Sequence, residues 1–413
     1  MFDVYLPIVA LAPATAYFEP PGLSPNLKTT LYYSVFVASL IGRPLGATIF
    51  GHFGDKIGRR RTLLVATGGF SAITLLIALL PGYRQIGLAS VILLLALRLL
   101  DGVFLGGEYT AANPLAMEYS PKQKRGINGA FITAGYAASS IAIAIVTAGV
   151  LYFMPGGGPD APFVRWGWRI PFLVGFLLSA ILFGYFFRVI PESEVWLSAS
   201  KSPSPLKEMI SGPNGRTLLQ VFIMMSGVWL AFLAAAATLP RVLQDTLRMS
   251  SQRVTGSLVI VNAVLFLGYL LFGQLGQTYG RRRMLIIGGL LNSTVSPGLY
   301  YYLMIRGYRS TLEMTVLLSA IEVLAVGGTL AIPLAYITER FPTSVRASGF
   351  GAGWSIALIA PSFYGFMMLG LARFMPYEFT QLVLLAIGGV VMAIGAALGP
   401  ETKDFDLAEQ SSG

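Results

Sequence analysis

The feature that most constrains this chain is the recurrence of long apolar stretches from one end to the other. Crossing the roughly 30 Å hydrocarbon core of a bilayer takes about 20 helical residues, and stretches near that length alternate with short polar gaps throughout the 413 residues. The sequence therefore predicts an all-α integral membrane protein. Its twelve transmembrane helices are expected over residues 2–18, 31–50, 62–80, 88–112, 127–153, 169–189, 217–239, 255–276, 284–304, 312–336, 347–371 and 377–398.

Composition agrees with a membrane protein, because 55% of the residues are hydrophobic and only 12% are charged. The net charge of +10 comes largely from clusters in short loops, where topology and anionic lipid headgroups explain it better than nucleic acid does. The absence of cysteine excludes disulfides and thiol chemistry. The single histidine, His52, is interpreted as a solvated loop residue. We therefore expect no enzymatic reaction, no cofactor and no metal site.

The distribution of basic residues predicts the topology. If the N-terminus is cytoplasmic, 17 of the 29 lysines and arginines fall inside and 10 outside, with Arg43 and Arg98 in the membrane. The positive-inside rule then favours a multi-pass protein of the cell membrane with both termini cytoplasmic. The first stretch has no basic leader, so no cleavable signal peptide is expected. Asp3 stands at its very start, which leaves a longer native N-terminus open.

The chain also contains an internal duplication. The stretch 97–125 aligns with 318–346 at an offset of 221 and without a gap, so that Asp101 falls on Glu322, Glu118 on Glu339 and Arg125 on Arg346. We therefore expect two pseudo-symmetric six-helix bundles of the same orientation, with a substrate between them near the midplane. The predicted organisation is a first bundle 1–190, a cytoplasmic linker 191–216, a second bundle 217–399 and a cytoplasmic tail 400–413.

Two carboxylates lie in the middle of apolar stretches, at equivalent positions of the duplication. Arg98 precedes Asp101 by three residues, which places the two side chains about 60° apart on one helix face. Glu322 has Ser319 in the place of that arginine. Because desolvation disfavours a lone ionised carboxylate, both acids are candidate proton-coupling residues, and Arg98 is a candidate for binding an anionic substrate group. The alternative is that Arg98 and Asp101 form only a structural ion pair.

A glycine- and arginine-rich segment occurs once in each half, at 51–61 and at 273–283. Gly51 and Gly58 permit close helix approach, and Asp55 could accept from the N-terminal amides of a helix in the other half, as a conformational latch. In the second copy Gln277 replaces the aspartate, which predicts a weaker latch, although Arg281 could still pair with Glu339. For the remaining arginines of both runs, topology alone is an equal explanation.

The segment 51–61 resembles the loop motif between the second and third helices of the major facilitator superfamily. Several other motifs resemble the metabolite:proton symporter branch of that superfamily, namely Gly42-Arg-Pro-Leu-Gly46, Gly106-Gly-Glu108, Glu118-Tyr-Ser-Pro-Lys-Gln-Lys-Arg-Gly126, Gly167-Trp-Arg-Ile-Pro-Phe172 and Glu339-Arg-Phe-Pro-Thr-Ser-Val-Arg346. The resemblance covers nearly the whole chain. It departs from the branch at Asp101, where a glutamine is common.

This resemblance implies roles for particular residues. Asp55, Arg59 and Glu118 would form a charge network that holds the cytoplasmic side closed. Asp3 with Tyr5 resembles the acidic-aromatic opening of the branch, which makes Asp3 a third proton-coupling candidate. The resemblance also implies a functional role for Arg43. Snorkelling or pairing with Glu108 would explain an arginine at this position equally well. The complete predicted sets are proton coupling by Asp101, Glu322 and Asp3; substrate binding by Arg98, Arg43 and Tyr5; and a latch of Gly51, Asp55, Gly58, Arg59, Glu118, Arg125, Arg281, Glu339 and Arg346.

Together these features predict a monomeric secondary transporter that couples a small-molecule substrate to an ion gradient. The midplane carboxylates favour a proton, with sodium left open. Two membrane arginines favour a small organic acid, because a guanidinium binds a carboxylate bidentately. A zwitterionic osmolyte or an amino acid would fit the same charges. A drug/proton antiporter is a further alternative, but its family typically has a glycine-proline motif in the fifth span, and the segment 126–135 contains no proline.

Overall fold

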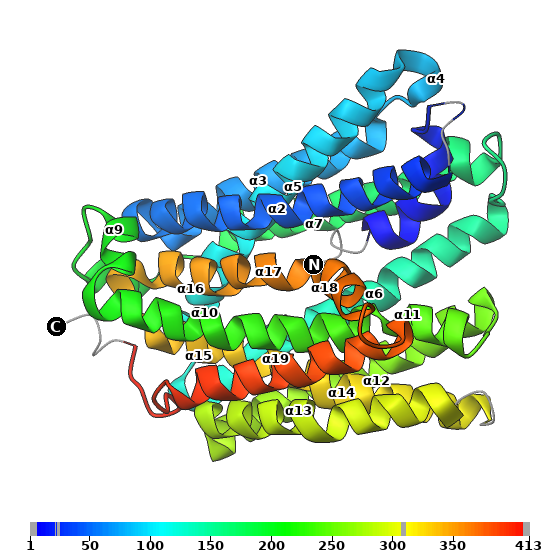
Figure 1. Ribbon diagram of the computed structural model, residues 1–413. Helices are drawn as coiled ribbons and strands as arrows, with labels where there is room; N and C mark the ends of the chain where they lie inside the picture. The colour runs from blue at the N-terminus through cyan, green and yellow to red at the C-terminus, as the bar shows by residue number, and fades with distance from the viewer. Residues whose placement is uncertain (1–5, 21, 23–24, 307–310, 408–413) are drawn as a thin grey trace. The chain divides into compact units, whose positions relative to one another are not determined.

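The computed structural model describes residues 6–20, 22, 25–306 and 311–407, and these residues form helices and connections without a β-strand. Most of these residues belong to long helices, which Figure 1 labels. They are α2 (Pro25–Ile57), α3 (Arg59–Leu79), α5 (Leu88–Tyr119), α6 (Arg125–Phe153), α7 (Arg169–Val189), α10 (Gly212–Phe232), α12 (Ser251–Tyr279), α13 (Arg281–Arg306), α14 (Leu312–Gly328) and α19 (Thr380–Ala397).

Short helical segments precede, continue or connect these helices. In the first part of the chain they are η1 (Pro7–Leu11), η2 (Ala12–Tyr17), α4 (Tyr83–Ile86), η3 (Lys122–Lys124), η4 (Phe163–Gly167), α8 (Glu194–Ser198) and α9 (Pro205–Ile210). In the second part they are η5 (Leu233–Ala237), α11 (Leu239–Arg241), η6 (Val242–Thr246), η8 (Thr329–Ala331), α15 (Ile332–Arg340), η9 (Thr343–Val345), α16 (Arg346–Ser355), η10 (Ile356–Leu358), α17 (Ile359–Ser362), α18 (Tyr364–Leu371) and η11 (Tyr377–Phe379).

Nine helical stretches of the described residues are long and apolar enough to cross a membrane. Neither α2 nor α13 is among them, although both exceed the length required. In α13 the reason is visible in the sequence, because three arginines open the helix and Asn292, Ser293, Thr294 and Ser296 interrupt its apolar run. A helix of that composition can lie in a bilayer only if its polar side chains are covered by protein.

Two stretches differ from their predicted form. The stretch 2–18 is not a regular α-helix in its described part, which is the π-helical segment η1 followed by the 3₁₀ segment η2. Pro7 and Pro13 cannot donate the backbone hydrogen bonds that an α-helix would need there. The expected loop after residue 50 is also absent, because α2 continues to Ile57. His52 is therefore a half-buried helical residue and not a loop residue.

The chain divides into two compact units, and the limits fall inside α5, inside α6 and between Glu192 and Ser193. The first unit comprises Met1–Ala112 and Ser139–Glu192, and the second comprises Asn113–Ala138 and Ser193–Gly413. The second unit therefore includes a segment from the first half of the sequence, namely the end of α5, η3 and the beginning of α6. The domain limits predicted from the duplication stay a prediction.

In the first unit, α2 and α5 approach each other through interlocking glycines. A Cβ atom added to Gly102 of α5 would collide with the carbonyl oxygen of Ser39 on α2, and one added to Gly106 would collide with that of Arg43. Conversely, a Cβ on Gly46 of α2 would collide with the Val103 carbonyl. Small residues let membrane helices pack backbone to backbone, which replaces the hydrophobic driving force that is missing in lipid. This contact fixes the register of α2 on α5.

In the second unit, α19 packs between α10 and α13, and the three helices lie side by side in Figure 1. Glycines again permit the contact. A Cβ on Gly389 of α19 would lie 2.5 Å from the carbonyl oxygen of Gly289 on α13, and one on Gly388 would lie 2.6 Å from the amide nitrogen of Ala231 on α10. The backbones of all three helices are therefore closely packed.

An exposed ion pair joins two loops of the first unit. Arg84 in α4 makes two hydrogen bonds with Asp160 in the loop after α6. The hydrogen bond from Arg84 lowers the pKa of Asp160 below its usual range, followed by the direct attraction of the two charges. Both side chains are well exposed, so water and salt screen the pair and its contribution to stability is small.

The glycine interlock leads to the first prediction. Gly102→Ala should destabilise the protein by about 1–3 kcal/mol, because α2 and α5 must separate to admit the methyl group. The matched control is Gly184→Ala in α7, where an added Cβ meets no atom within 4 Å; this change should be neutral or stabilising by up to about 1 kcal/mol. Thermal unfolding of the purified proteins in detergent measures the difference. Equal midpoints for the two variants would contradict the interlock.

Candidate functional site

Arg98 and Asp101 form a buried ion pair on α5. Arg98 Nη1 lies 2.8 Å from Asp101 Oδ2, and the two side chains are 1% and 2% exposed. The same carboxylate oxygen accepts a hydrogen bond of 3.4 Å from the Ser39 hydroxyl on α2. Ser39 reaches this position because Gly102 lets the Ser39 backbone rest directly on α5. The two side chains therefore lie on one helix face, as the sequence predicts, and they form the ion pair of the alternative interpretation; their roles in substrate and proton binding stay predictions.

Arg43 and Glu108 add further charge to this part of the first unit. Arg43, on α2, is half-buried and interacts electrostatically with Asp101. Glu108, two turns after Asp101 on α5, is also half-buried and acts on Asp101 as a like charge. The first unit thus places two cations and two carboxylates along the contact between α2 and α5. Asp3 and Tyr5, the other predicted members of this group, lie outside the described residues.

Glu322 occupies a different environment in the second unit. It is 1% exposed in the middle of α14, and neither of its carboxylate oxygens has a hydrogen-bond partner among the residues that the structure describes. Ser319, which stands where Arg98 stands in the first copy, donates its hydroxyl to the Thr315 carbonyl at 2.8 Å. Asp101 and Glu322 belong to different units, and their meeting across a cavity remains a prediction.

The first copy of the predicted latch contains a second buried ion pair. Asp55 Oδ1 lies 3.0 Å from Arg59 Nη1, and both side chains are fully buried. Arg59 also donates to the Gly54 carbonyl at 2.7 Å. Gly58 separates α2 from α3 and has a φ of 112°, a conformation that glycine adopts without the strain that a side chain would bring. Gly51 lies one turn before Asp55 on α2.

Two glutamates that we did not predict cap the helices that begin with the arginine runs. Glu192 accepts from the backbone amides of Arg59 and Arg60 at the start of α3, at 3.0 and 3.1 Å. Glu401 accepts from those of Arg281 and Arg282 at the start of α13, at 2.7 and 3.1 Å. A carboxylate satisfies free amides and complements the helix dipole at this end. The sequence contains a signal for these caps, because a Pro-Glu dipeptide occurs at 191–192 and again at 400–401.

The second unit contains the ion pair between Glu118 and Arg346. Arg346 Nη1 lies 2.7 Å from Glu118 Oε1, and the two side chains are 0% and 1% exposed. Arg346 also donates to the Phe341 carbonyl at 3.1 Å. Glu118 ends α5 and Arg346 begins α16, so this pair joins segments from the two halves of the sequence. Both residues were predicted members of the latch.

Glu339 is the centre of the same network. Its Oε1 accepts from Arg281 at 3.1 Å and lies 3.9 Å from Arg125, while its Oε2 accepts from the Thr402 hydroxyl. The Thr402 bond is 2.6 Å long. The structure therefore contains the Arg281–Glu339 pair that the sequence suggested. Both residues are almost fully buried, so the arginines and the threonine compensate a carboxylate that water cannot reach.

Gln277 makes the type of contact that was expected of Asp55. Its side-chain oxygen accepts from the amide of Gly126, in the first turn of α6, at 2.8 Å and from Arg281 at 2.9 Å. Its amide nitrogen donates to the Lys122 carbonyl at 3.3 Å. A neutral amide can both donate and accept, so Gln277 gains one bond that an aspartate could not make. The end of α12 is thereby bound to the start of α6.

The C-terminal tail is also part of this network, which the sequence did not indicate. Arg125 donates to the Phe405 carbonyl at 2.8 Å, and Arg346 donates to the Leu407 carbonyl at 3.3 Å. The side chain of Leu407 is 1% exposed. The duplication aligns Arg125 with Arg346, so equivalent arginines of the two copies bind carbonyls two residues apart in the tail.

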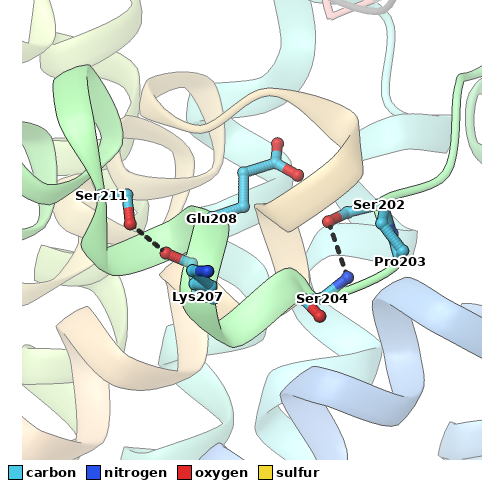
Figure 2. A pocket seen from close by; sticks show the side chains of 6 residues that line it. All are labelled: Ser202, Pro203, Ser204, Lys207, Glu208 and Ser211. Carbon is cyan, nitrogen blue, oxygen red and sulfur yellow. Dashed lines mark hydrogen bonds between the residues drawn. The ribbon is translucent and has the colours of Figure 1, made fainter.

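A shallow surface hollow of about 280 Å³ lies at the linker helix α9. Figure 2 shows two hydrogen bonds between its lining residues. The Ser211 hydroxyl donates to the Lys207 carbonyl at 2.6 Å, and the Ser204 amide donates to the Ser202 hydroxyl at 3.2 Å. The lining residues are Ser202, Pro203, Ser204, Lys207, Glu208 and Ser211. The hollow contains no residue of the predicted coupling, substrate or latch sets.

Comparison with known sequences identifies a family. The profile described as Major Facilitator Superfamily matches residues 1–365. Among similar proteins, the shikimate transporter of Escherichia coli K12 is 25% identical over 92% of this chain and 86% of its own length. The proline/betaine transporter of Salmonella typhimurium LT2 is 28% identical over 87% of this chain and 72% of its own length. A putative metabolite transport protein of Haemophilus influenzae is 29% identical over 99% and 94%.

Solved structures show the same fold. The proton:xylose symporter XylE bound to 6-bromo-6-deoxy-D-glucose superposes with a TM-score of 0.78 at 17% identity, covering 99% of this chain and 95% of that one. FucP in the outward conformation gives a TM-score of 0.70 at 13% identity, covering 96% of each chain. These matches confirm the predicted fold class, an all-α membrane protein of twelve helices in two bundles. The family and the relatives are transporters.

The buried Glu118–Arg346 pair leads to the second prediction. Arg346→Gln should cost about 3–5 kcal/mol of stability, because it leaves Glu118 buried without its cation. Glu118→Gln should also destabilise, and the double variant should lose less than the sum of the two single losses. Arg61→Gln is the control, since Arg61 is exposed and should change stability by less than about 0.5 kcal/mol. Thermal unfolding of all four proteins tests this; strictly additive losses would show that the pair carries no coupling energy.

Proposed function

The chain belongs to the Major Facilitator Superfamily, and we propose that it is a symporter that uses a proton gradient to move a small organic acid across the cell membrane by alternating access. The observation that carries this proposal is the buried pair of Arg98 and Asp101, 2.8 Å apart in the middle of an apolar helix. Burying two charges costs several kcal/mol per ion before they attract each other. A transporter gains from keeping them, because one can bind an anionic substrate and the other can exchange a proton.

Arg98 is the proposed anchor for the substrate. A guanidinium has five N–H donors in a planar fork, which suits a carboxylate. Arg43 lies close enough to interact with Asp101 and would strengthen the positive field on the same contact between α2 and α5. The similarity to a shikimate transporter supports an organic acid as cargo. Tyr5 is proposed as a further contact on the basis of the family resemblance.

Asp101 and Glu322 are the proposed proton-coupling residues, with Asp3 as a third candidate. The two acids occupy equivalent positions of the duplication, yet Asp101 is paired with Arg98 while neither oxygen of Glu322 has a hydrogen-bond partner in the described part of the chain. Displacement of Arg98 by a substrate would leave Asp101 without its cation. Protonation of Asp101 would then remove the free-energy cost of a buried carboxylate that has lost its cation. Substrate binding would thereby be linked to proton binding.

The network around Glu118, Glu339 and Arg346 is the proposed latch. We place it on the cytoplasmic side, together with both termini, because 17 of the 29 basic residues then face the cytoplasm. Its ion pairs join segments of the two sequence halves, so opening that side for substrate release requires that they break. The predicted bundles 1–190 and 217–399 would be the moving bodies, joined by the linker 191–216, in a monomer.

A zwitterionic substrate such as a betaine or an amino acid is the second candidate. The observation that favours it is the similarity to a proline/betaine transporter, which is 28% identical over 87% of this chain. A zwitterion presents both charges, and the Arg98–Asp101 pair could bind each of them to its opposite. Organic acids and zwitterions therefore compete as explanations of the same two residues, and binding experiments separate them.

The third prediction concerns proton coupling. In proteoliposomes loaded with an internal pH dye, uptake driven by an imposed pH gradient should be abolished in Asp101→Asn or in Glu322→Gln, whereas counterflow, which needs no proton movement, should persist. The amides keep the size of the acids but cannot release a proton. Thr294→Ala, an exposed change in α13, is the control and should transport normally. If both amide variants follow the pH gradient as the unmodified protein does, the assignment is wrong.

The fourth prediction concerns the cargo. In a thermal-shift screen of organic acids, amino acids and betaines, a ligand at 100 times its Kd should stabilise the protein by about 2.7 kcal/mol. Arg98→Gln should lose the shift caused by an organic acid, and Arg61→Gln should retain it. A betaine that shifts the unmodified protein while organic acids do not would select the zwitterionic alternative. A ligand shift of equal size in Arg98→Gln would rule out this arginine as the anchor.

A further inference from the structure

The helix α13 carries a buried polar stripe. Asn292, Ser296 and Tyr300 are spaced four residues apart, which places them along one side of the helix. Asn292 is 0% exposed, Ser296 is 1% and Tyr300 is 0%. Polar side chains in the middle of a membrane helix normally face protein or a water-filled space. Here the stripe points into the interior of the second unit, since exposed residues such as Leu290 and Val295 occupy the other side.

The helix α14 brings Glu322 to the level of this stripe. Gly288 of α13 packs against the Thr329 side chain, with an added Cβ lying 2.6 Å from its Cγ2, which sets the register of the two helical stretches. Glu322 precedes Thr329 by seven residues, about two turns, and projects within about 20° of it. About two turns along α13 from Gly288 lies Ser296, at the level of Glu322 and about 80° around the helix from Gly288. The Tyr300 hydroxyl, one turn further on, interacts electrostatically with Glu322.

Only one member of the stripe is hydrogen-bonded by its neighbours in the structure. Tyr300 shares a hydrogen bond of 2.9 Å with Thr238 and donates to the Ala235 carbonyl at 3.3 Å. In contrast, Glu322, the Asn292 amide and the Ser296 hydroxyl have no partner among the described residues. A buried polar group without a hydrogen-bond partner destabilises the protein, and a charged group does so more strongly. The register of α13 and α14 places Glu322 at the level of Ser296 and about one turn from Asn292, so one bound group could serve all three side chains.

No basic side chain of the described residues interacts with Glu322. The helices packed around it, α10, α12, α13 and α19, carry charged residues only within five residues of a helix end. Tyr300 on α13 is the titratable side chain that interacts with Glu322, while Tyr269 is the titratable group in the middle of α12. The equivalent carboxylate of the first copy, Asp101, has Arg98 at 2.8 Å. The first copy thus supplies a fixed cation, and the second supplies neutral oxygen and nitrogen groups.

We propose that Glu322, Asn292 and Ser296 bind one monovalent cation inside the second unit, either a hydrated proton or Na⁺. The carboxylate, the amide oxygen and the hydroxyl offer the oxygen ligands that hard cations prefer. One carboxylate among neutral ligands balances a single positive charge, and no cluster of three or more His, Cys, Asp or Glu residues that would suit a multivalent metal occurs in the described residues. This inference deepens the proposed function, since it rests on Glu322 being an ion-coupling residue and adds Asn292 and Ser296 as its partners.

The test measures ion-dependent stability of the purified full-length protein, without substrate. Thermal unfolding is followed against NaCl, with choline chloride keeping the ionic strength constant, and separately against pH without sodium. Saturable stabilisation by NaCl identifies Na⁺ as the ion, and a pH-dependent midpoint without a sodium effect identifies the proton. In either arm Glu322→Gln should abolish the response, and Asn292→Leu and Ser296→Ala should each weaken it by more than about tenfold. Thr294→Ala is the exposed control on the same helix.

The proposed site is wrong if these side chains form a polar cluster that binds no ion. In that case Asn292→Leu and Ser296→Ala would leave the sodium and pH responses unchanged and would raise the unfolding temperature, since apolar groups replace unmet polar ones. Counterflow of substrate in the same variants separates this failure from failure of the proposed function. If counterflow continues in proteins whose ion response is unaltered, the protein is a transporter that binds its ion elsewhere; if the unmodified protein shows no counterflow, the proposed function itself fails.

Discussion

A carboxylate that is buried away from water must be compensated by a cation, by hydrogen bonds or by a proton, and the polar interior of this protein follows from that constraint. Asp55 is paired with Arg59, Asp101 with Arg98, Glu118 with Arg346 and Glu339 with Arg281, at distances between 2.7 and 3.1 Å. At Asp101 a glycine contributes as well, because the close contact of Gly102 with the Ser39 backbone brings the Ser39 hydroxyl within reach of the carboxylate. Among the described acids that are at most 1% exposed, Glu322 is the one without a cation or a hydrogen bond.

The duplication makes this exception informative. Where the two copies agree, they use the same device, as when Glu192 and Glu401 each cap the helix that starts with an arginine run. Where they differ, the difference changes the chemistry. Asp101 has a fixed guanidinium beside it, whereas Glu322 has Ser319, whose hydroxyl is bonded to its own helix. With the proposed roles, the two copies would share a backbone while one binds an anion and the other a cation.

The sequence predicted the fold class and those contacts that leave a trace in local spacing or in the duplication. Arg98 and Asp101 were paired because three residues separate them on a helix, and Arg281 with Glu339 because both belong to repeated motifs. The carbonyls of Phe405 and Leu407 could not be anticipated, since every residue has a carbonyl and only the path of the chain decides which one an arginine meets. His52 was misplaced because Gly58 alone makes the turn after α2. Asn292 and Ser296 were overlooked because a polar stripe is recognised only when the facing helix is known.

One continuous helical stretch connects the proposed cation site to the proposed latch. Glu322 lies in α14 and Glu339 in α15, and between them the 3₁₀ segment η8 and Pro333 interrupt the regular α-helical hydrogen bonding. A 3₁₀ segment in the middle of a helix often marks a hinge. Neutralising Glu322 with a cation would remove the main electrostatic cost of moving α14 relative to α13, while the ion pairs of Glu339 hold α15 in place. If α14 moves while α15 stays in place, the stretch must bend at η8. This segment is therefore the point where ion binding and release of the latch would be coupled.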